Sequence, residues 1–400
     1  MIDNLPNGWK EEKIGNIIDL TIGKTPSRKK SEYFTGDNLW VSIADIKSIN
    51  LTNTKEKITE QAIKDSNIKK VKAGTLIMSY KLSIGKMAFT SQDLYTNEAI
   101  VALNIKINDL DKKFLYYYLL NADLEKTTDR AVKGKTLNKA KIEQIHIQFP
   151  PLQQQEKIVK VLDLTSNLIE KQKELLEKYD LFLKSKFIEM FGDPITNPMG
   201  WEAEKLENLI EKNKHSLKTG PFGSSLKKEF YVENGYKIYG QEQVIKNDFT
   251  YGNYYIDNDK YETLKNYSIK SDDILISLVG TFGKIAIVPK VFEEGIINPR
   301  LMKISLNKVL YNPVFFKYLF YAESFKAQLL SFSHGGTMGI LNLSILKELK
   351  YIKPPIKLQN KFASIVEKIE TIKEKENQKL KQFEDLHNSM MNKAFKGEIK

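Results

Sequence analysis

Two Gly-Lys-Thr tripeptides in the sequence have the residue types that bind phosphate. They occupy positions 23–25 and 134–136. A phosphate-binding P-loop needs a further glycine five residues before its Gly-Lys pair. Those positions hold Ile18 and Asp129. Both tripeptides therefore lack the loop that cradles a nucleoside triphosphate, and we expect no ATP site in this chain.

A third stretch with possible chemistry is Asn-Pro-Val-Phe at 312–315. It is similar to the Asn/Asp-Pro-Pro-aromatic motif that an amino-methyltransferase needs beside a Gly-rich cofactor loop. The corresponding stretch in the first half of the chain, 111–114, reads Asp-Lys-Lys-Phe and has no proline. Because proline is common in the first turn of a helix, we predict a helix start at 312–315.

The sequence also lacks the residues that metal sites and nucleophilic catalysis require. The chain has no cysteine, which excludes disulfides and Cys-based zinc sites. Its four histidines, His146, His215, His334 and His387, are scattered and form no recognisable pairing with a nucleophile. We therefore expect no metal site and no cofactor, and we expect the chain not to be an enzyme.

The charge of the chain favours a polyanionic partner. Lysine and arginine number 62 against 50 aspartates and glutamates, a formal net charge of +12 with a pI near 9.2. Such an excess is typical of proteins that bind nucleic acid or an anionic membrane surface. A Lys-rich, low-GC genome is the alternative explanation. With no 18-residue apolar run and no signal peptide, a cytoplasmic location is expected.

The motifs of the elements that must position any site occur twice in the sequence. Gly-Trp occurs at 8–9 and 200–201, and the loop TIGKTPSRKKSEYF is matched by LKTGPFGSSLKKEF. LIMS followed by Gly-Lys is matched by ILIS followed by Gly-Lys. Leu-Asn then Pro-Pro closes each copy. Because these similarities recur in the same order, the chain is predicted to contain an internal duplication.

Each copy is predicted to have a globular and a helical part, which makes the fold class α+β. The globular parts, 1–149 and 194–353, contain short Ile/Val/Tyr/Phe-rich strands with Gly and Asn turns. After each Pro-Pro, at 150–193 and 354–400, apolar residues return at spacings of three and four over about forty residues. A helix of that length is about 60 Å long. Its apolar stripe requires a partner helix, either the other copy in antiparallel orientation or a second molecule.

The sequence resembles a known family, the specificity subunits of type I restriction-modification systems. The resemblance covers essentially the whole chain. Its marks are the Gly-Trp openings, the GKTP and TGPFGSSL loops, the Ser-x5-Gly-Lys strand ends, and FPPLQQQEKIVKVLD before a helix that ends in FGDP. We call the passage from each globular part into its long helix, at Pro-Pro, a joint. The second joint differs from the first, because Lys-Leu-Gln-Asn at 357–360 replaces Gln-Gln-Gln-Glu at 153–156.

The resemblance implies a bacterial, non-catalytic subunit with two target recognition domains. Each domain would read one half of a bipartite, asymmetric site in double-stranded DNA. The long helices would set the gap as a coiled-coil spacer and dock two adenine-N6 methyltransferase subunits, to which endonuclease/translocase subunits add. S-adenosylmethionine and ATP with magnesium would bind those partners. A coiled-coil scaffold without DNA binding and a self-contained DNA-modifying enzyme are the alternatives.

Candidate DNA-binding residues are the basic, hydroxyl and amide side chains in equivalent loops of both copies, since such groups contact phosphates and base edges. They are Lys24, Thr25, Ser27, Arg28, Lys81, Lys86, Lys133 and Lys135 in the first domain, and Lys218, Thr219, Ser224, Ser225, Lys227, Gln241, Gln243, Thr281, Lys284, Arg300, Ser333 and His334 in the second. Candidate partner-binding residues at the helix joints are Gln155, Lys157, Gln359 and Lys361.

Overall fold

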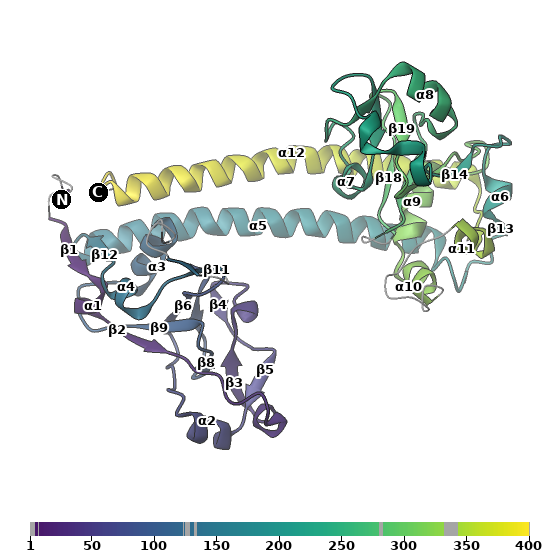
Figure 1. Cartoon of the computed structure of the whole chain (residues 1–400). Helices are drawn as coiled ribbons and strands as arrows, with labels where there is room; N and C mark the ends of the chain where they lie inside the picture. The colour runs from purple at the N-terminus through teal and green to yellow at the C-terminus, as the bar shows by residue number, and fades with distance from the viewer. Residues whose placement is uncertain are drawn as a thin grey trace. The chain divides into compact units, whose positions relative to one another are not determined.

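The computed structural model describes residues 5–6, 8–122, 124, 129–131, 134–279, 283–331 and 343–399 (Figure 1). The chain divides into two compact units. Unit 1 comprises Met1–Gln172 and Lys379–Lys400, and unit 2 comprises Lys173–Gln378. Two long helices contribute residues to both units.

Unit 1 is built on a five-stranded sheet of order β2-β9-β6-β7-β4 and a three-stranded sheet of order β5-β3-β8. The first contains β2 (Ile18–Ile22), β9 (Ile100–Ile105), β6 (Leu76–Ser79), β7 (Met87–Thr90) and β4 (Asn50–Leu51). The second contains β5 (Glu56–Ile58), β3 (Asn38–Val41) and β8 (Tyr95–Thr96). Two further pairs are β1 (Lys10–Lys13) with β12 (His146–Phe149), and β10 (Asp129–Ala131) with β11 (Gly134–Thr136). The helices are α1 (Ile14–Ile17), α2 (Glu60–Ser66), α3 (Lys112–Asn121), α4 (Lys139–Glu143) and the long α5 (Leu152–Phe191).

Unit 2 is built on a four-stranded sheet of order β14-β20-β17-β18 and a three-stranded sheet of order β16-β15-β19. The first contains β14 (Leu217–Thr219), β20 (Leu301–Ile304), β17 (Ile274–Ser277) and β18 (Ile285–Ile287). The second contains β16 (Tyr255–Ile256), β15 (Tyr236–Tyr239) and β19 (Gly295–Ile297). β13 (Ala203–Lys205) pairs with β21 (Lys350–Ile352). The helices are α6 (Leu206–Leu209), α7 (Gln241–Lys246), α8 (Asn258–Leu264), α9 (Pro313–Tyr321), α10 (Glu323–Ser331), α11 (Leu343–Glu348) and the long α12 (Ile356–Phe395).

The two units repeat one topology. The order β2-β9-β6-β7 in unit 1 corresponds to β14-β20-β17-β18 in unit 2, and every one of these pairings is antiparallel. In each smaller sheet the central strand pairs antiparallel with one neighbour and parallel with the other. The predicted α+β class and internal duplication are therefore confirmed.

Equivalent helices start with equivalent caps. The side chain of Asp111 accepts hydrogen bonds from the backbone N–H groups of Lys113 and Phe114 at the start of α3. The side chain of Asn312 does the same for Val314 and Phe315 at the start of α9. Such caps satisfy backbone donors that have no partner in the first helical turn. The stretch 312–315 is thus the helix start that the sequence predicts.

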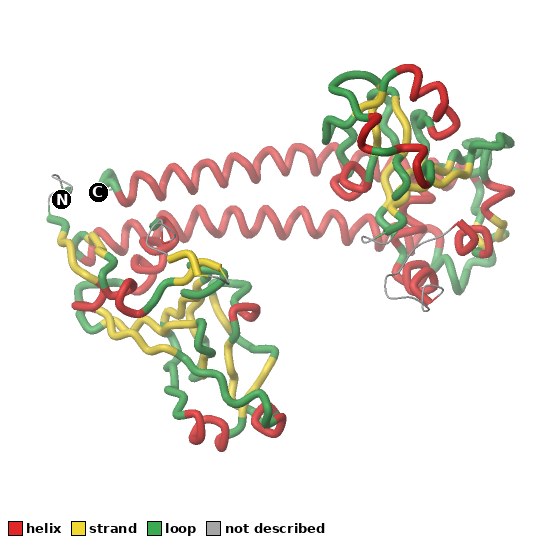
Figure 2. Tube along the Cα trace, viewed as in Figure 1, coloured by secondary structure: helices red, strands yellow, loops and turns green. Residues whose placement is uncertain are grey.

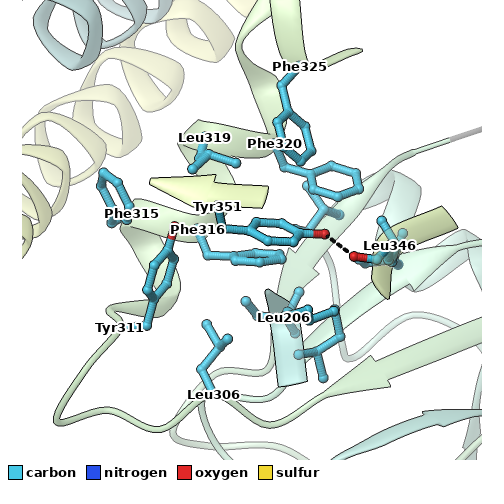
Figure 3. Close-up of a cluster of buried hydrophobic side chains, with 14 of the residues drawn as sticks. Leu206, Leu306, Tyr311, Phe315, Phe316, Leu319, Phe320, Phe325, Leu346 and Tyr351 are labelled. Carbon is cyan, nitrogen blue, oxygen red and sulfur yellow. Dashed lines mark hydrogen bonds between the residues drawn. The ribbon is translucent and has the colours of Figure 1, made fainter. Parts of the chain in front are cut away.

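The aromatic residues of α9 form the core of unit 2. Phe315 and Phe316 are both fully buried and pack with Tyr311 and Tyr351 (Figure 3). The two tyrosine hydroxyls are satisfied inside this core, because Tyr351 donates to the carbonyl of Leu346 at 2.9 Å and Tyr311 donates to that of Ile352 at 2.8 Å. Because these rings are buried in the core, they are not available to stack on nucleic acid bases.

The long helices run antiparallel within each unit. In unit 1 the Gln154 side chain bonds the carbonyl of Ile399, and Thr165 bonds His387. In unit 2 Lys373 forms an ion pair with Asp180 at 2.7 Å. Within each unit, positions that rise along α5 thus meet positions that fall along α12. Figure 2 shows each of the two as one uninterrupted helix. The predicted intramolecular antiparallel pair is confirmed. Separately, no described helix is long and apolar enough to cross a membrane.

His387 lies in the helix pair of unit 1, where its Nδ1 contacts Thr165 Oγ1 at 2.7 Å. Burial lowers the pKa of His387 below its ordinary value. Protonation is thus more costly in the folded state, so stability present at neutral pH falls as the pH drops through 6.5. We expect His387→Gln to reduce the loss of unfolding free energy between neutral pH and pH 5.5, measured by urea unfolding. The control His146→Gln changes an exposed histidine, and an equal effect there would contradict the prediction.

Candidate nucleic-acid interface and helix joints

In unit 1, two of the predicted DNA-binding loops meet at the segment that joins β8 to β9. The N–H of Lys24 donates to the carbonyl of Thr96 at 2.9 Å, and the N–H of Tyr80 donates to that of Ala99 at 3.0 Å. A Cβ atom on Gly23 would lie 2.1 Å from the oxygen of Thr96, so only glycine permits this approach. The loops at 23–28 and 80–86 are thereby fixed beside one another.

Unit 2 brings the equivalent loops together at the corresponding segment, which joins β19 to β20. The N–H of Gly220 donates to the carbonyl of Leu301 at 2.9 Å, and the N–H of Leu278 donates to that of Arg300 at 3.0 Å. A Cβ atom on Gly220 would lie 1.9 Å from the oxygen of Asn298. The place where loops converge is therefore common to both units, whereas the side chains at it differ.

An asparagine organises this place in each unit. The backbone N–H of Asn97 bonds to Val41 and that of Asn298 bonds to Tyr239, which ties each segment to the central strand of the smaller sheet. The Asn97 side chain accepts from the N–H of Ala99 at 3.0 Å, and the Asn298 side chain accepts from the N–H of Arg300 at 2.9 Å. Ala99 is buried, whereas its counterpart Arg300 is exposed.

Arg28 is held in a defined orientation by Glu56 and two aromatic rings. Its guanidinium forms two parallel hydrogen bonds of 2.6 and 2.8 Å to the Glu56 carboxylate. Its Cζ atom lies 4.3 Å from the centre of the Phe34 ring and 5.0 Å from that of Trp40. The hydrogen bonds with Glu56 raise the pKa of Arg28 and lower that of Glu56. The fork that engages Glu56 has the geometry that reads guanine O6 and N7.

Glu98 occupies the middle of the unit 1 convergence and was not predicted from the sequence. Its carboxylate accepts a hydrogen bond from the hydroxyl of Thr25, and its backbone carbonyl accepts one from the hydroxyl of Tyr80 at 2.8 Å. The Lys81 ammonium lies 5.4 Å from the centre of the Tyr80 ring. A carboxylate accepts hydrogen bonds from the exocyclic amino group of cytosine. Glu56 and Glu98 were missed because both pairings join residues far apart in the sequence.

The glutamines chosen in unit 2 have separate roles. Gln243 is 4% exposed, and its side chain bonds the N–H of Gly240 and the carbonyl of Tyr251, both at 2.9 Å. It stabilises the α7 start and is not on the surface. Gln241 is half-buried and donates to Ser277 Oγ at 2.7 Å and to the carbonyl of Val279. Gln241 therefore joins α7 to the end of β17.

The remaining predicted DNA-binding residues lie mostly on the surface of their unit. Lys218 is half-buried above the ring of Tyr267 at 4.2 Å, and burial lowers its pKa. Thr25, Lys81 and Thr219 are half-buried; Lys24, Ser27, Arg28, Lys86, Ser225, Lys227, Lys284 and Arg300 are exposed. Lys135 belongs to β11, and Ser224 belongs to the 3-10 helix Gly223–Leu226. Lys133, Thr281, Ser333 and His334 lie outside the described residues.

At the helix joints, the two predicted glutamines are inside the fold. Gln155 is fully buried, and its Oε1 accepts from the N–H of Asp111 at 2.8 Å. Its Nε2 donates to the carbonyls of Asp109 and Pro150, both at 2.7 Å. The side chain thus fastens the start of α5 to the start of α3.

Gln359 makes the same three contacts in unit 2. It accepts from the N–H of Asn312 at 2.8 Å and donates to the carbonyls of Leu310 and Pro354 at 3.1 and 2.7 Å. These polar first-turn residues thus have a structural role. Contact with a partner subunit stays a prediction for Lys157 and Lys361, which are exposed.

A groove lies beside each joint, on the side where the long helix meets the cap of α3 or α9. In unit 1 it has a volume of about 410 Å³ and is lined by Asp111, Glu156, Val159, Lys160, Asp163, Leu164 and Asn167. In unit 2 the larger cavity includes Asn312, Asn360, Ala363, Ser364 and Glu367 at the equivalent positions. The two units therefore have similar surfaces at equivalent positions beside the joints.

Comparison with known proteins identifies similar chains. The family model described as "Type I restriction modification DNA specificity domain" matches residues 6–178 and 198–382. The MjaIX specificity subunit of Methanocaldococcus jannaschii, a type I restriction enzyme subunit, is 28% identical over 254 residues. This match covers 58% of the chain, and the chain spans 57% of that relative. The MjaVIII specificity subunit of the same organism is 23% identical over 99% of the chain and 94% of the relative.

A solved structure described as bearing on complex assembly and conformational transition of the type I R-M system has the same fold. Its TM-score is 0.59 at 15% sequence identity, and the superposition covers 98% of each chain. At this level of identity the likeness concerns the fold alone.

Proposed function

Because this chain belongs to the type I restriction modification DNA specificity domain family, we propose that it selects the DNA sequence for a restriction-modification complex. Each unit binds one half of a bipartite, asymmetric site in double-stranded DNA. The chain itself is non-catalytic. Cleavage, translocation and adenine-N6 methylation belong to partner endonuclease and methyltransferase subunits, which bind ATP with magnesium and S-adenosylmethionine.

The observation that carries this proposal is the common convergence of loops with different side chains. The backbone contacts of Asn97 and Asn298 are equivalent, so each unit presents the same place to a ligand. Unit 1 presents Arg28 and Glu98 there, whereas unit 2 presents Arg300 and Gln241. Two copies of one scaffold with different polar residues suit two different half-sites, because hydrogen bonds to base edges determine sequence preference.

The repeated grooves support docking of two methyltransferase subunits, one beside each joint. Each groove combines a helix cap, Asp111 or Asn312, with the exposed first turns of a long helix. The exposed Lys157 and Lys361 are on those same turns. Within the described residues, no three His, Asp or Glu side chains cluster in a way that could hold a metal ion. A cytoplasmic location accords with these partners.

The direct test is a methylome. The chain is expressed with the methyltransferase encoded beside it in a host that lacks adenine methylation, and N6-methyladenine is mapped by single-molecule sequencing. We expect a single bipartite motif with a fixed gap. A stable co-purifying complex that methylates nothing would favour a scaffold without DNA binding. Methylation by the purified chain alone would show a self-contained enzyme and sink the proposal.

Arg28 and Arg300 allow the half-sites to be separated by matched substitutions. We expect Arg28→Ala to relax one base position of one half-site, and Arg300→Ala to relax a position of the other. A lost bidentate arginine–guanine contact weakens discrimination by about 1–3 kcal/mol, roughly five- to 150-fold. The readout is the methylation motif of each variant. Weakening that is uniform across all sequences would instead make the arginine a phosphate contact.

A further inference from the structure

The cavity of unit 2 that includes the joint residues Asn312 and Asn360 is also lined by a group of lysines. The groove has a volume of about 960 Å³ and is lined by residues of α5, α9, α10, α12 and the β17–β18 hairpin. Lys184 of α5, Lys284 of the hairpin, Lys317 of α9 and Lys326 of α10 all line it. Lysines from four separate elements therefore face one cavity.

These lysines differ from another lysine in the same groove. Lys373 forms ion pairs with Asp180 at 2.7 Å and with Glu370 at 3.1 Å. Among the described residues, none of Lys184, Lys284 and Lys326 lies within ion-pair distance of a carboxylate. Lys373 is thus neutralised by ion pairs within the chain, whereas Lys184, Lys284 and Lys326 form no ion pair among the described residues.

Lys184, Lys284 and Lys326 are close enough that their charges oppose one another. Burial is the main cause that lowers the pKa of Lys326, and the charges of Lys184 and Lys284 lower it further, while the charge of Glu323 acts in the opposite direction. Burial also lowers the pKa of Lys317, which lies deeper in the groove. Mutual repulsion of this kind destabilises the free protein and is relieved when an anion binds between the cations.

The shared fold does not require these lysines, because unit 1 has neutral residues at two of the positions. Five residues after the helix caps Asp111 and Asn312, unit 1 has Tyr116 and unit 2 has Lys317. Along the long helices, aligned on Gln155 and Gln359, the position of Lys184 is matched by Asn388. Lys184 and Lys317 are therefore particular to unit 2, whereas Lys284 has the counterpart Lys86 in unit 1.

We propose that Lys184, Lys284 and Lys326 together bind a phosphate of the DNA backbone, an inference that rests on the proposed function. The cluster adjoins the candidate interface, because the N–H of Ser277 donates to the carbonyl of Lys284 at 2.9 Å and Ser277 Oγ accepts from Gln241 at 2.7 Å. A DNA backbone that passes Gln241 can thus continue over Lys284 toward α10 and α5. Lysine ammonium groups act as point charges suited to phosphate and carry little base information.

The test is the salt dependence of DNA binding by the full-length chain. The variant Lys184→Gln/Lys284→Gln/Lys326→Gln is compared with Lys205→Gln/Lys212→Gln/Lys350→Gln, which removes three exposed lysines of unit 2 from other elements. Both variants lose the same charge. Binding to a labelled duplex with the methylated motif, and to a scrambled duplex, is measured over a range of salt concentrations.

We expect the cluster variant to reduce the slope of log K against log salt by about 0.9, the value for one phosphate contact. The reduction should be equal on both duplexes, and the control variant should keep the wild-type slope. An equal reduction of the slope in both variants would show that the overall positive charge of the protein, and not this cluster, attracts the DNA. That result would overturn the inference. An unchanged slope together with lost co-purification of the methyltransferase would assign the lysines to an acidic partner surface, which also overturns it. Absence of salt-dependent binding by the wild-type chain would contradict the proposed function itself.

Discussion

Gln155→Leu is expected to destabilise unit 1 by at least about 3 kcal/mol, because it removes the partners of three backbone groups at once. The N–H of Asp111 and the carbonyls of Asp109 and Pro150 would be left without the amide that now bonds them. Each unsatisfied buried group costs roughly 1–3 kcal/mol. Leucine has a volume comparable to that of glutamine and no amide group, so the substitution tests chiefly the hydrogen bonds.

Hydrogen exchange read by mass spectrometry gives the local measurement for this prediction. In Gln155→Leu, protection should fall at the start of α3 and be kept at the start of α9. The reverse should hold for Gln359→Leu, which removes the same three contacts in unit 2. Gln153→Leu is the control, because Gln153 is exposed on the same helical turn. A control variant as unstable as Gln155→Leu would show that the amide contacts are not the cause.

Much of the fold was predictable because its signals are local in the sequence. The apolar spacing after each Pro-Pro predicts a helix to Phe191, and α5 ends at that residue. The order of matched motifs predicts the duplication that the strand orders show. The antiparallel pairing was one of two arrangements that the apolar stripes allowed, since each stripe could be covered by the other copy or by a second molecule.

The roles of individual polar residues were less predictable, because they depend on contacts between distant segments. Gln155 and Gln243 have the composition of surface residues, yet both are buried where backbone groups need partners. Glu98 was not predictable because its partner Thr25 lies 73 residues away in the sequence. Its hydrogen bond with Thr25 depends on how β8 and β9 return the chain to the first loop.

Shortening both long helices by equal lengths is expected to change the gap of the DNA motif and leave the two half-sites unchanged. Each helix has 40 residues and contributes to both units. Deletion of residues 169–175 from α5 and 377–383 from α12 removes two turns from each. The contacts Thr165–His387 and Asp180–Lys373 lie outside the deleted segments, so both can still form.

The proposed function gives this deletion a defined result. Seven helical residues span about 10 Å, which corresponds to about three base pairs of a duplex whose turn of about ten base pairs spans roughly 34 Å. We expect the methylome of the double deletion to show a gap shorter by up to about three base pairs. A gap shorter by about three base pairs rotates one half-site relative to the other by close to a third of a turn. Methylation should therefore also be weaker. Deletion from α5 alone is the control, since it prevents both contacts from forming together and should abolish methylation. If the double deletion kept the original gap, or altered the half-site sequences, the helices would not set the spacing. Their length would then serve only the packing of each unit and the docking of partners.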